Sequence, residues 1–199
     1  MSSAGLRRVP WHLRWRTAPR AASALRIRVA RLTHLHCRVE IDGSVYAGPG
    51  FRLEIPGNGT LIVGPRVQFR RGFYCEISGD GVVTIGAGSV FTADAMVQCT
   101  TSITIGERCV FAQGVLLADG AHRFRDWTRH TQEQGYDFRP LVIKDDALVL
   151  AKCTVVSDIG YRAVIAANSL VNRPVPDYTL AGGVPARALE YFGPDPAAP

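Results

Sequence analysis

The chain has 199 residues and a formal net charge of +6, from 23 lysines and arginines against 17 acidic residues. Its length fits one domain with short additions and is sufficient to bury a core. The five cysteines are an odd number without C-x-x-C spacing. This argues against a disulfide framework and against metal binding by cysteines, and it fits a reduced compartment.

Residues 1–40 carry most of the positive charge. They hold nine arginines against Glu40 alone, a charge of +8, which leaves −2 for the other residues. Pro10 and Pro19 break any earlier helix, so we expect a helix over about residues 21–35. The interspersed arginines exclude a membrane span and a signal peptide. We expect residues 1–40 either to cap the end of the fold or to contact an anionic membrane surface, and we do not expect a nucleic acid partner.

From residue 58 to residue 172, an apolar residue recurs every six positions, and a small or slender residue usually follows it four positions later. The pairs are Val63/Val67, Phe69/Phe73, Ile85/Ser89, Phe91/Ala95, Val97/Thr101, Ile105/Cys109, Phe111/Val115, Leu117/Ala121, Ile143/Ala147, Val149/Cys153, Ile159/Ala163 and Ile165/Ser169. A period of six fits neither a helix nor an ordinary alternating strand, and it indicates a parallel β-helix. Each repeat would form one short strand and a corner, and three repeats would form one coil.

Two details of the repeats carry further expectations. Glycine follows several of the apolar residues, as in Val63-Gly64 and Ile85-Gly86, where we expect it to supply backbone angles that corners require. Val155 and Ile159 are only four positions apart, so one coil should be two residues short. An antiparallel β-sandwich is the alternative fold, but it predicts turns at irregular spacing.

The repeats stop after the run Asp119-Gly120-Ala121-His122. Residues 123–140 are polar and aromatic, and a β-helix cannot hold eighteen such residues in its interior. They are expected to leave the prism as a long loop, and long loops on rigid scaffolds are commonly functional. A histidine at that exit is placed where a base can be presented to a cleft.

Residues 173–199 turn through several prolines, and a short helix over about residues 185–191 is expected to cap the far end. The chain therefore divides into three parts. Residues 1–57 form the basic segment with its helix and the start of the cap, residues 58–172 form the β-helix with the excursion 123–140, and residues 173–199 form the C-terminal cap and tail.

Several motifs in this order resemble the hexapeptide-repeat acyltransferases, in particular the maltose/galactoside and polysaccharide O-acetyltransferase branch. Besides the repeats, they are Asp119 to Phe124, Glu133-Gln134-Gly135, Leu141 to Asp146 and Ala181 to Arg187. The resemblance implies a mainly β fold, a left-handed parallel β-helix with an N-terminal basic helical segment. It also implies a homotrimer that binds acetyl-CoA or another acyl-CoA between subunits, requires no metal, and acylates a sugar or glycan hydroxyl.

The resemblance also implies roles for individual residues. His122 would be the general base, which suits histidine because it titrates near neutrality and can take a proton from the attacking alcohol. Asp119 would orient the ring of His122 or bind the acceptor. The other acceptor-side candidates are Thr92, which stands where the branch has asparagine, and Asp94. The cofactor-side candidates are Leu148, Ala151, Lys152 and Arg187.

Two other functions stay open. Altered glycine positions and the short coil are compatible with a trimeric scaffold or binding protein that has lost catalysis. An acyltransferase with an aminosugar acceptor is also compatible, because the same base serves a hydroxyl and an amine. The expected location is the cytoplasm, either free or peripheral at the inner face of the membrane.

Overall fold

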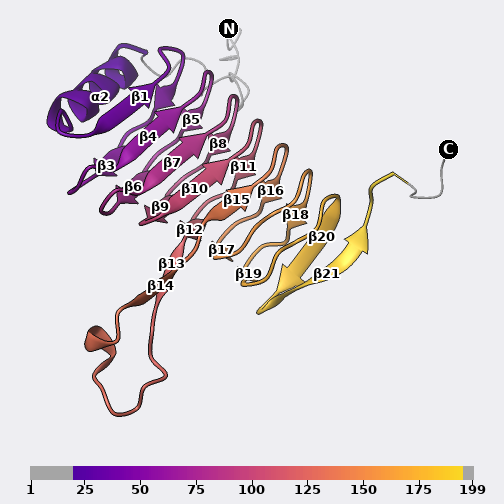
Figure 1. Ribbon diagram of the computed structural model, residues 1–199. Helices are drawn as coiled ribbons and strands as arrows, with labels where there is room; N and C mark the ends of the chain where they lie inside the picture. Colours follow the sequence, from indigo (N-terminus) through magenta and orange to yellow (C-terminus); the bar gives the residue numbers. More distant parts are fainter. Residues whose placement is uncertain (1–19, 195–199) are drawn as a thin grey trace, which may run out of the picture.

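The structure is a computed structural model that describes residues 20–194. Its strands wind around a triangular prism, three strands to a coil, and stack into three sheets along the sides of the prism (Figure 1). Within the coils, each strand pairs in parallel with the strand of the next coil. This is the parallel β-helix that the six-residue spacing predicts.

The three sheets are named A, B and C in the order in which the chain visits them. Sheet A contains β1 (Arg38–Ile41), β4 (Thr60–Val63), β7 (Val82–Ile85), β10 (Ser102–Ile105) and β15 (Leu141–Ile143). Sheet B contains β2 (Tyr46–Ala47), β5 (Gln68–Phe69), β8 (Val90–Phe91), β11 (Val110–Phe111), β16 (Leu148–Val149), β18 (Val164–Ile165), β20 (Thr179–Gly183) and β21 (Ala186–Tyr191). Sheet C contains β3 (Arg52–Glu54), β6 (Tyr74–Ile77), β9 (Met96–Cys99), β12 (Leu116–Ala118), β17 (Thr154–Val155) and β19 (Leu170–Val171).

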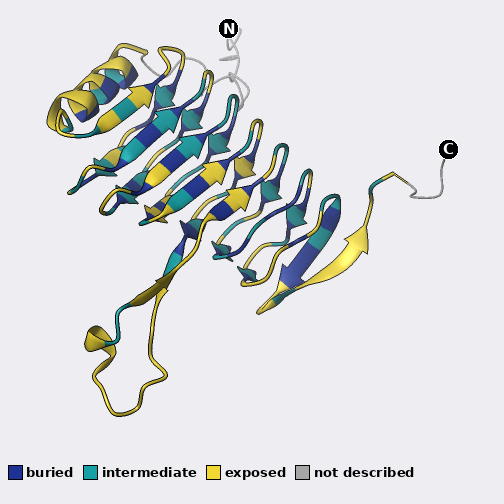
Figure 2. Ribbon diagram, viewed as in Figure 1, coloured by how far each residue is buried: buried dark blue, intermediate teal, exposed yellow. Residues whose placement is uncertain are grey.

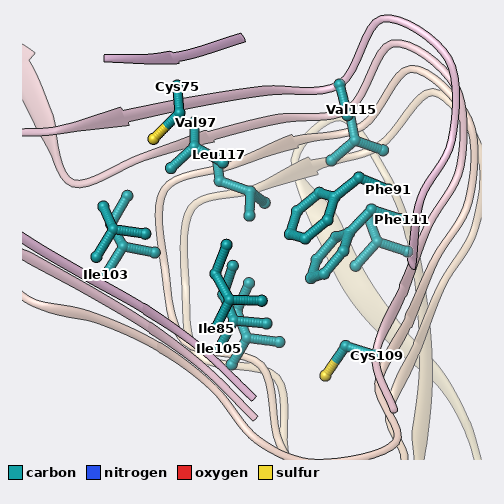
Figure 3. Packing of buried hydrophobic residues seen from close by; sticks show 14 of the residues in the cluster. Cys75, Ile85, Phe91, Val97, Ile103, Ile105, Cys109, Phe111, Val115 and Leu117 are labelled. Atoms are coloured by element: carbon teal, nitrogen blue, oxygen red, sulfur yellow. The ribbon is translucent and has the colours of Figure 1, made fainter. Parts of the chain in front are cut away.

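The apolar residues of the repeats point into the prism and stack in columns. Phe91 lies over Phe111 with ring centroids 4.6 Å apart, and Ile85 is in register with Ile105 on the next side (Figure 3). All four side chains are at most 1% exposed. Burying a large apolar side chain contributes roughly 1.5–3 kcal/mol, so these columns are the main source of stability.

Two of the predicted slender positions are wrong. Thr101 and Ala121 are exposed, whereas Cys99 and Asp119, two positions earlier in each case, are buried. The reason is that strands of sheets C and A carry a second inward position, Cys99 on β9 and Ile103 on β10 in this coil, and only Thr100 and Thr101 lie between those two strands. Val97 and Ile105 are eight positions apart, not six, so the corner residue falls elsewhere.

The expected role of glycine after the apolar residue is also corrected. Gly86 and Gly106 are not among the residues with positive φ. Instead, a Cβ on Gly86 would lie 2.5 Å from the carbonyl carbon of Gly106, and a Cβ on Gly106 would lie 2.6 Å from the backbone nitrogen of Asp145. Glycine is required here because the corners of successive coils approach closely.

The N-terminal end of the prism is covered by α2 (Arg20–Thr33), which confirms the expected helix. Ile27 and Ala30 are buried against the first coil, and the hydroxyl of Ser23 accepts a hydrogen bond from the backbone N–H of Ala47 at 2.8 Å. The helix therefore caps the open end of the solenoid, as a terminal repeat requires. The arginines and tryptophans before residue 20 lie outside the described residues.

The other end is closed by a strand, and the expected helix over residues 185–191 is wrong. β21 pairs antiparallel with β20 and extends sheet B (Figure 1). The prism is also longer than residues 58–172, because β1 to β3 already form a coil and β20 continues sheet B. Ile41, Ala47 and Leu53 keep the spacing of six, but the small Ala47 conceals it. The short coil is confirmed: Ile159 bridges Ile143, sixteen positions before it.

The excursion leaves the prism as expected. β13 (Gly120–His122) and β14 (Tyr136–Phe138) form an antiparallel hairpin, and residues 123–135 form its tip, which contains the short 3-10 helix η1 (Thr131–Glu133). The hairpin projects from the side of the solenoid and is exposed over most of its length (Figures 1 and 2). Figure 2 also shows how the buried positions alternate with exposed ones along the sheets.

Candidate active site

His122 is the last residue of β13, at the point where the chain leaves the prism. It lies opposite Tyr136 of β14, and the two rings have centroids 4.1 Å apart. The imidazole is exposed, and no hydrogen bond within residues 20–194 involves either of its nitrogens. One ring nitrogen is therefore available to accept a proton from a ligand.

Asp119 holds the corner from which β13 departs. Its carboxylate accepts hydrogen bonds from the backbone N–H groups of Thr100 at 2.9 Å and Thr101 at 2.6 Å. It also accepts bonds from the hydroxyl of Thr101 at 2.8 Å and from the thiol of Cys99 at 3.5 Å. Asp119 is 4% exposed and does not hydrogen-bond His122. The hydrogen bonds that its carboxylate accepts therefore all come from the corner of the preceding coil.

A cleft of about 460 Å³ lies between the hairpin and sheet C, and we call it the hairpin cleft. It is lined by Glu76, Ser78, Gln98, Cys99, Thr100, Ala118, Asp119, Gly120, Ala121, His122, Tyr136 and Phe138. Tyr136 and Phe138 stack with centroids 5.3 Å apart and an interplanar angle of 13°, so one wall of the cleft is aromatic. The hairpin cleft therefore combines an aromatic wall, a polar sheet face and a candidate base.

A second cleft of about 320 Å³ lies on the other side of His122, within the tip of the excursion. This arginine cleft is lined by His122, Arg123, Phe124, Arg125, Asp126, Arg129, Gln134 and Asp137. Its shape is held by the Gln134 side chain, which donates to the carbonyls of Asp126 at 2.9 Å and Arg129 at 3.0 Å. Arg123 also pairs with Asp137 at 2.6 Å. His122 is shared by the two clefts.

Four other predicted site residues lie on a different edge of the prism. Thr92 and Asp94 follow β8, and Ala151 and Lys152 follow β16, so all four lie on the edge between sheets B and C. His122 follows β12 and lies on the edge between sheets C and A. The structure therefore brings these four residues onto one edge but does not bring them to His122 within one copy.

The polar atoms on the B–C edge differ in their partners. The hydroxyl oxygen of Thr92 is buried and has no hydrogen-bond partner within the described residues. Asp94 pairs with Arg71 at 3.4 Å, and both side chains are exposed. Lys152 makes no ion pair within residues 20–194, whereas Lys144 on another edge is paired with Asp177 at 2.9 Å. Of the four predicted residues on this edge, Lys152 therefore presents an unpaired charge to a ligand, whereas the unpartnered hydroxyl of Thr92 is buried.

The remaining cofactor-side candidates are spread along sheet B. Leu148 is half-buried on β16, in register with Val110 and Val164. Arg187 is exposed on the terminal strand β21, opposite Gly182. Neither lies next to His122.

Of the residues that line the hairpin cleft, only His122 and Asp119 were predicted from the sequence as site residues. Tyr136 and Phe138 occupy alternate positions in the excursion, a spacing that could have suggested a strand with one aromatic face. Glu76 and Gln98 carry no such signal. They reach the cleft only because β6 and β9 are adjacent in sheet C.

The buried cysteines are unsuited to nucleophilic chemistry. Burial raises the pKa of the Cys99 thiol to about 12 and that of Cys109 to about 11, and it raises the pKa of Cys75 as well. The thiolate is the reactive form, and it is scarce under these conditions. Within residues 20–194, no cluster of three or more histidine, cysteine or acidic side chains is arranged to hold a metal ion. The helix in that range is too short and polar to cross a membrane.

Sequence comparison gives a limited match. No protein-family model matches the chain. A Mycobacterium tuberculosis protein named a probable acetyltransferase is 27% identical over 113 residues, which are 56% of this chain and 38% of that protein. The chain thus spans about two fifths of the length of this curated relative.

Solved structures give a closer match in fold. A hexapeptide-repeat acetyltransferase of Vibrio cholerae, in complex with acetyl-coenzyme A, has a TM-score of 0.57 at 21% identity, covering 93% of this chain and 91% of that one. A variant of the N-acyltransferase AntD of Bacillus cereus, in complex with dTDP and coenzyme A, has a TM-score of 0.61 at 17% identity, covering 82% and 89%. A polysialic acid O-acetyltransferase has a TM-score of 0.58 at 14% identity, covering 80% and 89%. The chain therefore has the hexapeptide-repeat β-helix fold of these acyltransferases.

Proposed function

We propose that the chain is a CoA-dependent O-acyltransferase that moves an acyl group, in the simplest case acetyl, from CoA to a sugar or glycan hydroxyl. The observation that carries the proposal is His122. It stands at the exit of the β-helix, both of its ring nitrogens are free of hydrogen bonds within the described residues, and it lines two clefts. The relatives named as acetyltransferases, and the similar structures that contain acetyl-CoA or CoA, support the same reaction class.

The reaction follows from this arrangement. His122 accepts the proton of the acceptor hydroxyl as the oxygen attacks the thioester carbonyl carbon. A C–O bond forms, the tetrahedral intermediate collapses, and the C–S bond breaks. The imidazolium then returns the proton to the leaving thiolate, so His122 ends in its initial state. The buried thiols with raised pKa supply no competing nucleophile, which favours direct transfer over an acyl-enzyme.

The B–C edge has features that fit an acyl-CoA. Its corners carry the small residues Ala112, Ala151 and Ala166, so an extended pantetheine arm can lie along the stacked coils. The hydroxyl of Thr92 is buried without a partner, which costs about 1–3 kcal/mol, and rotation of this side chain towards a bound ligand would relieve that cost. The unpaired Lys152 offers a positive charge to the phosphates of the cosubstrate.

A homotrimer completes the site. Since His122 lies on one edge and Thr92 and Lys152 on another, a cosubstrate on the B–C edge can meet His122 only if a neighbouring copy supplies it. The exposed tip of the excursion, including Trp127 at 93% exposure, would then contact the neighbour and shape the shared cleft. Closed symmetric assembly repeats this contact three times.

Transfer to an amine is the second candidate, and it rests on the likeness to AntD, which is named an N-acyltransferase. The same base serves both acceptors. Parallel assays with a sugar alcohol and an aminosugar distinguish them. A scaffold without catalysis is the third candidate, and failure to bind acetyl-CoA would favour it.

Contact with an anionic membrane surface is a separate proposal for the N-terminal end. Leu25, Val29 and Leu32 form an exposed apolar stripe on α2, on the face opposite the buried Ile27, and Arg28 lies beside it. An apolar stripe next to arginine is suited to the interface of an anionic bilayer. Flotation with anionic and neutral vesicles tests this, with a variant in which Leu25 and Leu32 are replaced by serine as the control.

The experiment for the main proposal compares two histidines of the same excursion. His122→Ala should lower the rate of acyl transfer by about two to four powers of ten, the usual effect of losing an acid–base group. His130→Ala is the matched control, because His130 lies on the same loop but lines neither cleft. Equal activity of both variants would refute the assignment of His122.

A further inference from the structure

The two walls of the hairpin cleft differ in chemistry. The hairpin presents the rings of His122, Tyr136 and Phe138, and sheet C presents the polar side chains of Glu76 and Gln98. Among residues 20–194, no lysine or arginine lines this cleft, whereas three arginines line the adjoining arginine cleft. Within the described residues, a ligand in the hairpin cleft therefore meets carboxylate, amide and imidazole groups, and no ammonium or guanidinium group.

Glu76 has acceptor capacity to spare. Its carboxylate accepts hydrogen bonds from the hydroxyl of Tyr74 at 3.2 Å and from the side-chain amide of Gln98 at 3.4 Å. An ionised carboxylate has about four lone-pair sites, so two remain. Glu76 makes no ion pair within residues 20–194. Its neighbour Glu54 accepts from the same Tyr74 hydroxyl at 3.1 Å, but it is paired with Arg52 at 2.7 Å and does not line the cleft.

Tyr74 remains a donor in this arrangement. Burial and the two adjacent carboxylates raise the pKa of Tyr74 to about 12. The phenol is therefore protonated at physiological pH, and its single proton is shared between Glu54 and Glu76. The neutral phenol therefore leaves the charge of Glu76 without a counter-ion within residues 20–194.

The position of Glu76 also fixes what it can reach. Glu76, Gln98 and Ala118 occupy one register column on β6, β9 and β12. Adjacent strands are about 4.8 Å apart, so Glu76 lies roughly 10 Å along the sheet from the strand that leads to His122. That separation leaves room for a sugar ring. Glu76 can therefore contact groups on the far side of the ring but not the reacting hydroxyl.

We propose that the hairpin cleft selects a neutral or basic sugar, and that Glu76 positions it by accepting hydrogen bonds from hydroxyl or ammonium groups remote from the reacting oxygen. The apolar face of the sugar lies against Tyr136, where aromatic surface is available. Sugars with a carboxylate are disfavoured, since their charge would face Glu76 with no lysine or arginine in the lining that residues 20–194 provide. This inference rests on the proposed transferase function and names its acceptor class.

The test uses the full chain, acetyl-CoA and three acceptor probes: methyl glucoside, glucosamine and glucuronic acid. CoA release is followed with a thiol reagent, and sugar binding is measured separately by saturation-transfer NMR. The wild type should bind and acylate the neutral and basic probes in preference to glucuronic acid. Glu76→Gln should raise KM for the preferred probes about tenfold with little change in kcat. The substitution removes a charged hydrogen-bond acceptor that contacts the bound sugar but not the reacting atoms. Glu76→Arg should shift the preference towards glucuronic acid.

Glu54→Gln is the matched control. It removes the other carboxylate bound to Tyr74 but leaves the lining of the cleft intact, so its KM should match the wild type. An unchanged KM in Glu76→Gln, an equal effect in Glu54→Gln, or a wild-type preference for glucuronic acid would overturn the inference. The NMR measurement separates the two proposals. If acetyl-CoA does not bind but the sugars still bind in a Glu76-dependent manner, the transferase proposal fails and the sugar site stands.

Discussion

Asp119 offers a direct test of how the β-helix presents its candidate base. We expect Asp119→Asn to act mainly on stability. The carboxylate accepts bonds from two backbone N–H groups, at Thr100 and Thr101, and from the hydroxyl of Thr101. An asparagine retains one acceptor oxygen and turns an NH₂ group towards the other donors. One of the two partly buried N–H groups is then left unpaired, and the remaining bonds lose their ionic character.

The magnitude follows from these contacts. An unpaired buried donor costs about 1–3 kcal/mol, and hydrogen bonds to a charged group are roughly twice as strong as neutral ones. Together these predict a loss of about 2–4 kcal/mol in the free energy of unfolding of Asp119→Asn, measured by urea denaturation. Asp126→Asn is the control, because Asp126 makes the same type of bonds to Thr128 in the exposed excursion. It should change stability by less than about 0.5 kcal/mol.

The alternative reading of Asp119 is that it binds the acceptor or orients His122. In that case, Asp119→Asn would retain wild-type stability and lose acyl transfer by more than a hundredfold. That combination would refute the structural role derived from the corner at Thr100 and Thr101. A destabilised variant that retains transfer activity at low temperature is the result that the hydrogen bonds predict.

Three further predictions follow from the prism and its assembly. In a co-expressed mixture, His122→Ala copies and bulky Thr92→Trp copies should complement each other in a transfer assay, to about a quarter of wild-type activity. Each site takes His122 from one copy and Thr92 from its neighbour, so a site is active only when the first copy is Thr92→Trp and the second is His122→Ala. In a random equal mixture about one site in four meets this condition, and the absence of rescue would contradict a shared site. Phe111→Ala should lower the free energy of unfolding by about 3–5 kcal/mol in urea denaturation, because Phe111 is fully buried. Phe124→Ala on the exposed loop should change it little, and equal effects would contradict the packing. Lys144 and the N–H of Tyr161 hold the pKa of Asp177 below its usual range, so Asp177 should stabilise the fold above about pH 4 and lose this effect on acidification. The stability difference between wild type and Asp177→Asn, measured across pH, should therefore vanish in acid, and its persistence at low pH would contradict the assignment.

The sequence predicts the β-helix well because each inward position carries its own signal. Phe69, Phe91 and Phe111 each stand six positions after an inward aliphatic residue, and in the structure they stack in one column. Such a fold is built from repeated local units, so a one-dimensional pattern contains most of its three-dimensional order. In the first coil, the inward position of β2 is the small residue Ala47, so the spacing of large apolar residues did not predict this coil.

The C-terminal segment shows the opposite case. Residues 186–191 contain alanine, leucine and glutamate, which favour helix, yet they form β21. The edge of sheet B at β20 has unpaired backbone groups, and β21 satisfies them. The need to pair the edge of β20 exists only once the sheet has formed, so the helix propensities of residues 186–191 do not predict it.

The candidate site was predictable only in part. The end of the repeats drew attention to His122, and the structure places it beside a cleft. Its ring partner Tyr136 comes from the far side of the excursion, and Glu76 comes from two coils earlier. Their positions depend on strand pairing across the loop and along sheet C, which the spacing of residues does not determine.

The measurement that tests the central claim most directly is a calorimetric titration of the full chain with acetyl-CoA and CoA, in parallel with a determination of its oligomeric state. The proposal that this fold serves acyl transfer predicts saturable binding near one site per copy in a trimer. It also predicts weaker binding of both ligands to Lys152→Ala, because Lys152 is a cation on the B–C edge that makes no ion pair within residues 20–194. A folded trimer that binds neither acetyl-CoA nor CoA would contradict the transferase and favour the scaffold.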